Sequence, residues 1–180
     1  MSSHLGGFVP GGDPNTTYPV LWEWFVEEFG LRSVLDVGCG DGAALRAFRR
    51  LGCLAEGVDG VEQPDDGEIF LCDYTTGTFN PGRSYDLVWS CEFVEHVEEE
   101  FVPNFLKTFQ AGRYVAMTHA VPGQPGYHHV NCRDADYWVS KLESVGFRLD
   151  EGLTGEAREI SRQDEAPHNY FTLTGMVFTQ

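Results

Sequence analysis

At 180 residues, of which 42% are hydrophobic and 22% charged, the chain can bury one sizeable core but is short for two domains, so we expect residues 1–180 to form a single domain. No apolar run approaches the roughly 20 residues of a membrane span, and the first residues lack the basic start of a secretory signal, which predicts a cytoplasmic protein with no membrane partner. A formal net charge of -16 disfavours nucleic acid as a partner.

Residues 1–17 are rich in glycine and proline and are expected to form a flexible N-terminal flap. From Tyr18 to Phe29 apolar residues recur at helical spacing, with Gly30 as the cap, which predicts a helix. We expect its aromatic side chains to pack the helix onto a sheet. In the alternative interpretation, Tyr18 and Trp22 are walls of a pocket.

A buried strand that ends in a glycine-rich turn is predicted by VLDVGCGDG at residues 34–42. Branched and bulky apolar side chains favour a strand over Ser33–Gly38 that is buried on both faces, and the glycines permit backbone conformations closed to other residues. Apolar residues at helical spacing then predict a helix over Asp41–Leu51. A strand, glycine turn and helix in this order outline a nucleotide-binding crevice.

The rest of the chain alternates predicted strands and helices. Strands are expected at 54–59, 68–73, 85–91, 114–118 and 147–150, and helices at 101–109 and 135–145. Residues 151–168 show no convincing period, whereas the runs YFTL and MVFT within 170–179 are typical of strands. The pattern predicts an α/β, Rossmann-like doubly wound fold with a mostly parallel, seven-stranded sheet and an antiparallel last strand. Only VEQPDDG separates the second and third strands, so their crossover is expected to be shortened.

Three acidic residues, Asp36, Asp59 and Asp73, stand at or just past the ends of the first three predicted strands. Because the ends of parallel strands meet at one edge, where ligands bind, we expect them to share a site, with Asp59 placed to accept the hydroxyls of a ribose. The glycine spacing of residues 38–43 also satisfies the dinucleotide fingerprint. The charges of Asp36 and Asp41 would repel a pyrophosphate, however, and attract a ligand with an ammonium and a sulfonium group.

The chain resembles the class I S-adenosylmethionine-dependent methyltransferases over roughly residues 20 to 150. The motifs that carry the resemblance are LDVGCGDG (35–42), GVDG (57–60), LCDYT (71–75) and YDLVWSCEFVEHV (85–97). The resemblance implies an enzyme of this class with S-adenosylmethionine as its cofactor. The residues implied to bind the cofactor are Gly38, Gly40 and Gly42 at its amino-acid part, Asp36 at its ammonium group, Asp59 at the ribose, and Asp73 with Tyr74 at the adenine.

A second set of candidate residues combines carboxylates and imidazoles from two segments on the same predicted edge. If the chain turns helical after the fourth strand, Glu92 shares a face with Glu95 and with His96. An imidazole near a hydroxyl acceptor can act as a base because its ordinary pKa lies close to neutrality. The candidate catalytic residues, as bases or acceptor-orienting groups, are Glu92, Glu95, His96, His119, His128 and His129.

Carboxylates and imidazoles from two loops are also compatible with a divalent cation. The E-x-x-E-H arrangement resembles the metal site of the small-RNA 2′-O-methyltransferases and the Glu-His motif of the quinone-biosynthesis O-methyltransferases. The first resemblance implies as ligands Glu92, Glu95, His96 and either His128 or His129. The same segment is common in methyltransferases that bind no metal, so no metal site is assigned and a cation is not favoured. His4 and His168 are expected to be solvent histidines.

The predicted function is methyl transfer from S-adenosylmethionine to an oxygen of a small-molecule or saccharide acceptor. The chain also resembles small stand-alone methyltransferases in GGDP (11–14), the YP-x-LW segment (18–22) and HHVN (128–131). The segments expected to contact the acceptor are the flap, residues 119–133 and, as a further candidate, residues 151–168. One alternative is metal-assisted 2′-O-methylation of an RNA end, which the net charge disfavours. The other is a non-catalytic cofactor-binding or accessory domain.

Overall fold

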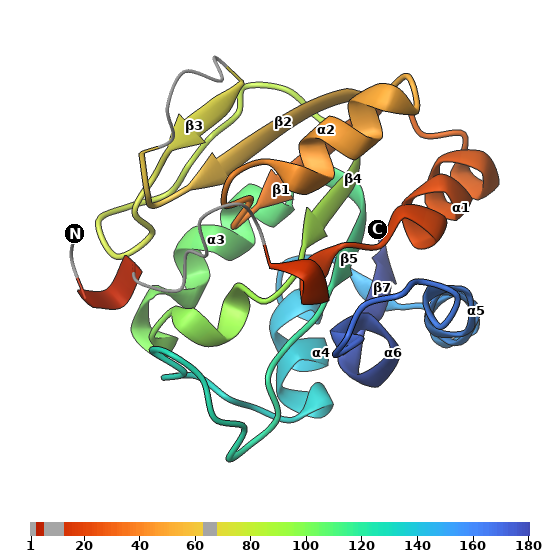
Figure 1. The fold of residues 1–180 in the computed structure, drawn as a ribbon. Coiled ribbons are helices and arrows are strands. Elements are labelled where there is room, and N and C mark those ends of the chain that lie inside the picture. Colours follow the sequence, from red (N-terminus) through yellow and green to blue (C-terminus); the bar gives the residue numbers. More distant parts are fainter. Residues whose placement is uncertain (1–2, 6–12, 63–67) are drawn as a thin grey trace.

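The computed structural model describes residues 3–5, 13–62 and 68–180, which form a seven-stranded sheet with helices on both faces (Figure 1). The strand order is β3-β2-β1-β4-β5-β7-β6, and β7 runs antiparallel to both of its neighbours. The strands are β1 (Ser33–Val37), β2 (Leu54–Asp59), β3 (Ile69–Leu71), β4 (Tyr85–Ser90), β5 (Gly112–Met117), β6 (Arg148–Leu149) and β7 (Met176–Thr179). The predicted Rossmann-like, mostly parallel sheet with an antiparallel last strand is confirmed.

Two hydrophobic cores lie on opposite faces of the sheet. In β1, Val34 packs into one core and Leu35 into the other, and both are fully buried, as expected for a strand covered on both faces. The first core is covered by α1 (Pro19–Phe29), α2 (Ala43–Arg50), α5 (Glu151–Ser161) and α6 (Tyr170–Thr174). The second is covered by α3 (Val102–Phe109) and α4 (Ala135–Glu143). Short 3₁₀ turns are η1 (Ser3–Leu5), η2 (Pro14–Thr16), η3 (Val94–His96) and η4 (Glu99–Phe101).

The aromatic residues at the start of α1 belong to the core. Tyr18 and Trp22 are buried and meet Trp89 of β4 edge to face, with ring centroids 6.0 and 6.1 Å away. The Tyr18 hydroxyl donates a hydrogen bond to the carbonyl of Asn15. Packing of α1 onto the sheet is thus confirmed, and the alternative that Tyr18 and Trp22 wall a pocket is wrong.

The C-terminal region differs most from its prediction. Helix α5 occupies part of the stretch 151–168, and its buried face consists of Thr154, Ala157 and Ser161, small side chains that give no visible apolar period. The YFTL run is also helical, because Asn169 caps α6 by accepting a hydrogen bond from the Thr172 amide. Only the MVFT run forms the predicted strand.

One predicted strand is shorter in the structure, and two predicted segments lie partly outside the described residues. β3 is shorter than the predicted 68–73, and the crossover between β2 and β3 consists of residues 60–68, of which 63–67 lie outside the described part of the chain. Of the predicted flap 1–17, residues 1–2 and 6–12 also lie outside it. Among the described residues, no helix has the length and apolar character needed to cross a membrane.

Candidate functional site

Two adjoining pockets open at the carboxyl-terminal edge of the parallel strands. The strand-end pocket is lined by residues that follow β2 and β3, together with His4 and Leu5 of η1. The loop pocket is lined by the glycine turn after β1, by residues 125–127 and by Tyr170 of α6. Gly38, Glu92 and His96 line both pockets, so these residues mark the place where the two pockets meet.

Asp59 ties the glycine turn to the end of β2 in the strand-end pocket. Its carboxylate accepts hydrogen bonds from the backbone amides of Gly40, at 2.9 Å, and Val61, at 2.8 Å. Burial raises the pKa of Asp59, although these amide hydrogen bonds oppose the shift. Asp59 therefore stands at the pocket wall where the sequence places a ribose-binding carboxylate.

Asp73 lies in the same pocket and accepts hydrogen bonds from the Thr75 amide and hydroxyl, at 2.9 and 2.7 Å, while its other oxygen contacts His4 Nε2 at 2.9 Å. Partial burial raises the pKa of Asp73, but the hydrogen bonds from Thr75 and His4 hold it below its ordinary value overall. The expectation that His4 is a solvent histidine is wrong, because its imidazole contacts the Asp73 carboxylate. His168 is exposed, as expected.

The pocket also contains Tyr74, whose ring is buried and whose hydroxyl donates to Thr108 Oγ1 at 3.1 Å. Burial raises the pKa of this hydroxyl. Because Tyr74 already has a hydrogen-bond partner in α3, what it offers the pocket is chiefly its ring and backbone.

The glycine turn brings its backbone to the junction of the pockets. Gly38, Gly40 and Gly42 all have positive φ, and a Cβ at Gly38 would lie 2.6 Å from the Phe93 ring. Gly38 and Gly40 line the loop pocket, whereas Gly42 precedes α2 and does not. Asp36 lines the loop pocket too, and burial, with the Asp59 charge, raises its pKa well above the ordinary value.

Glu92 occupies a constrained position directly after β4. Its φ of 52° is unusual for a non-glycine residue, and its backbone amide donates to Thr118 Oγ1 at 2.8 Å. The same hydroxyl lies 3.4 Å from a Glu92 carboxylate oxygen. Burial raises the pKa of Glu92 to about 7. The chain does not turn helical directly after Cys91, the condition considered from sequence, but forms this turn and then the short η3.

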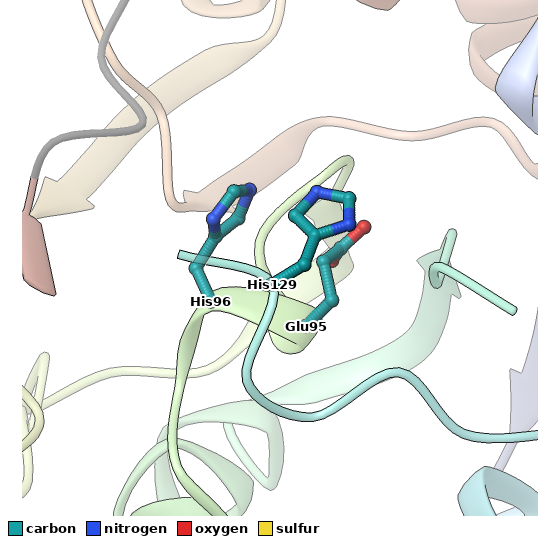
Figure 2. A group of neighbouring side chains, drawn as sticks. All are labelled: Glu95, His96 and His129. Carbon is teal, nitrogen blue, oxygen red and sulfur yellow. The ribbon is translucent and has the colours of Figure 1, made fainter. Parts of the chain in front are cut away.

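Glu95, His96 and His129 converge beside Glu92. One ligand-type atom from each of the three lies within 4.8 Å of the others, and all three side chains extend toward the same side of the backbone (Figure 2). Glu95 is fully buried, and its pKa is raised well above the ordinary value by burial and by the Glu92 carboxylate. Burial, with the neighbouring His129, lowers the pKa of His96 to about 4.

The other two candidate histidines lie elsewhere. His119 is buried, with its ring nitrogen Nδ1 3.4 Å from the Ala120 carbonyl, and burial lowers its pKa. His128 Nε2 contacts Glu98 at 3.1 Å. Neither side chain is among the residues that line the two pockets, and neither belongs to the group formed by Glu95, His96 and His129.

The sequence prediction placed residues 119–133 at the acceptor but did not name the aromatic side chains of the loop pocket. Trp89 of β4, Tyr127 and Tyr170 contribute aromatic lining, and Gly126 packs against the His129 ring so closely that a Cβ there would lie 2.1 Å from Nε2. For Gly126 the sequence signal was the G-x-H-H spacing. Tyr170 had no such signal, because it belongs to helix α6, which was not predicted.

Comparison with known proteins gives a partial match to one curated sequence. The ubiquinone biosynthesis O-methyltransferase of Rhodopseudomonas palustris (strain BisB5) is 34% identical over 87 residues, which cover 43% of this chain and 33% of that enzyme. The chain thus matches about a third of the length of this relative.

Solved structures share the fold over most of the chain. The 1,6-didemethyltoxoflavin-N1-methyltransferase of Burkholderia thailandensis, solved with 1,6-didemethyltoxoflavin and S-adenosylhomocysteine, has a TM-score of 0.59 at 14% identity, over 88% of this chain and 74% of that one. A SAM-dependent methyltransferase from Archaeoglobus fulgidus has a TM-score of 0.58 at 19% identity, over 90% and 94% of the two chains. At these identities the likeness is one of fold.

A family model described as a methyltransferase domain matches residues 19–151. The match contains all seven residues predicted to bind the cofactor, together with the Glu92–His96 segment and His129. Because this match covers well over half of the sequence, the chain belongs to the methyltransferase-domain family.

Proposed function

We propose that this chain is an S-adenosylmethionine-dependent methyltransferase that methylates an oxygen of a small-molecule or sugar-like acceptor. The observation that carries the proposal is the meeting of two pockets at Gly38, Glu92 and His96. A donor with its adenosine in the strand-end pocket and its amino-acid part along the glycine turn would have its sulfonium methyl at that junction.

The strand-end pocket supports the cofactor assignment. Asp59 has the charge and position to accept both ribose hydroxyls, and the Asp73 segment offers acceptors and backbone to an adenine. In the loop pocket, Asp36 and Asp41 suit the ammonium and sulfonium charges of the donor. The similar B. thailandensis enzyme was solved with S-adenosylhomocysteine, the product of this donor.

The chemistry needs alignment and a proton acceptor. We assign the proton acceptor to Glu92, which lines both pockets and is held by Thr118. The acceptor hydroxyl gives its proton to Glu92 while the hydroxyl oxygen attacks the methyl carbon. The sulfur–methyl bond breaks with its electron pair left on sulfur, which yields the methyl ether and S-adenosylhomocysteine.

The lining of the loop pocket favours an uncharged, hydroxyl-bearing acceptor. Tyr127 and Tyr170 offer aromatic surface, whereas Asp13 and Asp41 would repel the phosphates of a polynucleotide. An RNA end is therefore the second candidate, supported only by the Glu95, His96 and His129 cluster.

The test has two steps. Calorimetric titration with S-adenosylhomocysteine should show one binding site per chain. Incubation with S-adenosylmethionine and a panel of catechols, polyols, monosaccharides and short RNA 3′ ends should then give a methyl ether of a small acceptor, detected by mass spectrometry. Absence of cofactor binding contradicts the proposal, methylation of RNA alone favours the second candidate, and binding without any product favours a non-catalytic domain.

A further inference from the structure

We propose that Asp13 selects the acceptor by accepting a hydrogen bond from a second hydroxyl group, so that the substrates of this chain are polyols. Asp13 lines the loop pocket together with Glu92, the residue assigned as proton acceptor. The inference rests on the proposed function, and it narrows the small-molecule acceptors to those that carry at least two hydroxyl groups.

Asp13 is a fixed carboxylate with one oxygen still available. Its Oδ1 accepts a hydrogen bond from the Asn15 amide at 2.8 Å, which caps η2. Its own carbonyl accepts from the Thr16 amide and hydroxyl, at 3.0 and 2.9 Å. Within the described part of the chain, no group donates to Oδ2 of Asp13. A ligand in the pocket therefore meets an oriented acceptor that has no competing partner.

Hydrogen bonds between the two ends of the chain hold Asp13 on the same wall as Tyr170. The Tyr18 hydroxyl donates to the Asn15 carbonyl at 2.6 Å and accepts from the Phe171 amide at 3.3 Å. The turn before α1 is thereby joined to α6 (Figure 1). Asp13 and Tyr170 both line the loop pocket, so this wall is built into the fold.

Only a hydrogen-bond donor suits Asp13. A carboxylate accepts hydrogen bonds and donates none, so the oxygen of a ketone or an ether has nothing to bind there. No lysine or arginine of the described residues lines the loop pocket, whereas Asp13 and Glu92 both contribute carboxylates. Burial, reinforced by the Asp13 charge, raises the pKa of Glu92 to about 7, so the two groups also interact electrostatically. A polyol can donate to both.

The aromatic lining suits the carbon skeleton of a polyol. Trp89, Tyr127 and Tyr170 contribute rings to the loop pocket. Ligand pockets commonly combine such walls with a few polar groups that fix the orientation of the ligand. With Asp13 and Glu92 as those groups, the reacting hydroxyl gives its proton to Glu92, as in the proposed reaction. The second hydroxyl keeps its proton and its bonds, and serves only to align the first.

The test measures binding of methyl β-glucopyranoside and its monodeoxy derivatives to the full chain saturated with S-adenosylhomocysteine, by ligand-observed NMR. For the wild type, removal of the hydroxyl that meets Asp13 should weaken binding about tenfold, since a hydrogen bond to a charged group is lost. Asp13→Ser keeps an oxygen to cap η2 but lacks the available carboxylate oxygen. In this variant the same removal should change the affinity by less than about twofold.

The matched control is Asp134→Ser, the same exchange at the cap of α4, which lines neither pocket and should keep the wild-type pattern. Two outcomes overturn the proposal: no hydroxyl whose removal weakens binding to the wild type, or the same loss in the wild type and Asp13→Ser.

Titration with S-adenosylhomocysteine precedes these measurements and verifies that Asp13→Ser is folded. It also separates the two proposals. A wild type that binds no cofactor contradicts the proposed function, whereas cofactor binding without an Asp13-dependent loss contradicts only the role of Asp13.

Discussion

In the strand-end pocket, Asp59 and Asp73 accept hydrogen bonds from backbone amides, from Thr75 and from His4. Beside the loop pocket, by contrast, both carboxylate oxygens of the buried Glu95 in η3 lack a hydrogen-bond partner. Both regions use carboxylates on segments that follow strands of the sheet, so residue type alone does not distinguish them. They differ in whether the protein itself supplies hydrogen-bond donors to those carboxylates.

The difference indicates two ways of preparing a binding site. Where amide groups already orient a carboxylate, a ligand meets a fixed acceptor and loses little free energy to reorganisation. Where buried polar atoms remain unpartnered, the free energy of the unoccupied state is raised, and a ligand that supplies the missing partner gains that amount. The first pocket is prepared by its hydrogen bonds, whereas the second depends on what binds there.

Glu92→Gln gives the largest expected effect and tests whether the chemistry lies at the junction. Loss of the proton acceptor should lower kcat at least about 100-fold, as for other general bases. Affinity for S-adenosylhomocysteine should hardly change, because the amide keeps the size of the side chain. Steady-state kinetics and calorimetry measure the two quantities, with the exposed Glu100→Gln as control. A variant that keeps the wild-type kcat would exclude Glu92 as the base.

Asp59→Ala tests the strand-end pocket. Loss of two charge-assisted hydrogen bonds to the ribose should weaken S-adenosylhomocysteine binding about 100-fold in calorimetry. Asp86→Ala is the matched control, because Asp86 also accepts backbone amides, those of Arg32 and Ser33, but at the opposite end of β1. It should reduce stability and leave cofactor affinity intact. Equal losses of affinity in the two variants would contradict the assignment of Asp59.

Gly126→Ala tests the loop pocket. The new methyl group would overlap the His129 ring and displace it, so we expect kcat/KM for the acceptor to fall about tenfold with cofactor affinity unchanged. Gly77→Ala serves as control, since a Cβ at Gly77 meets nothing within 4 Å. If both variants keep full activity, the position of His129 does not matter to turnover.

The smallest effect is expected for His4→Ala. His4 holds the Asp73 oxygen that an adenine amino group would use, so its removal should strengthen S-adenosylhomocysteine binding by up to about fivefold, the value of one modest hydrogen bond. Calorimetry against the wild type measures it. Weaker binding would instead show that His4 contacts the bound cofactor.

The strand-end pocket was largely predictable from sequence, because its residues sit on consecutive strands of a parallel sheet. The positions of Asp59 and Asp73 follow from where β2 and β3 end. The sheet itself followed from buried apolar runs such as Val34–Val37.

The loop pocket was less predictable because contacts between distant segments assemble it. No local pattern shows that the amides of Val130 and Asn131 bond to Glu95, and this pairing is what brings His129 rather than His128 to the cluster. Tyr170 was assigned to a strand because β-branched and aromatic propensity outweighed the capping signal of Asn169. Tertiary contacts determined each of these positions.

The Glu95 carbonyl accepts hydrogen bonds from the amides of Val130 and Asn131, and this pairing affects how acceptor preference can change by mutation. Any backbone shift in residues 124–131 that accommodates a new acceptor would pull on η3 and so move Glu95 and His96. Acceptor preference and reaction rate should therefore change together under mutation of that backbone. Side-chain exchange at the exposed Tyr127, which needs no such shift, offers selection a route to new acceptors at constant rate.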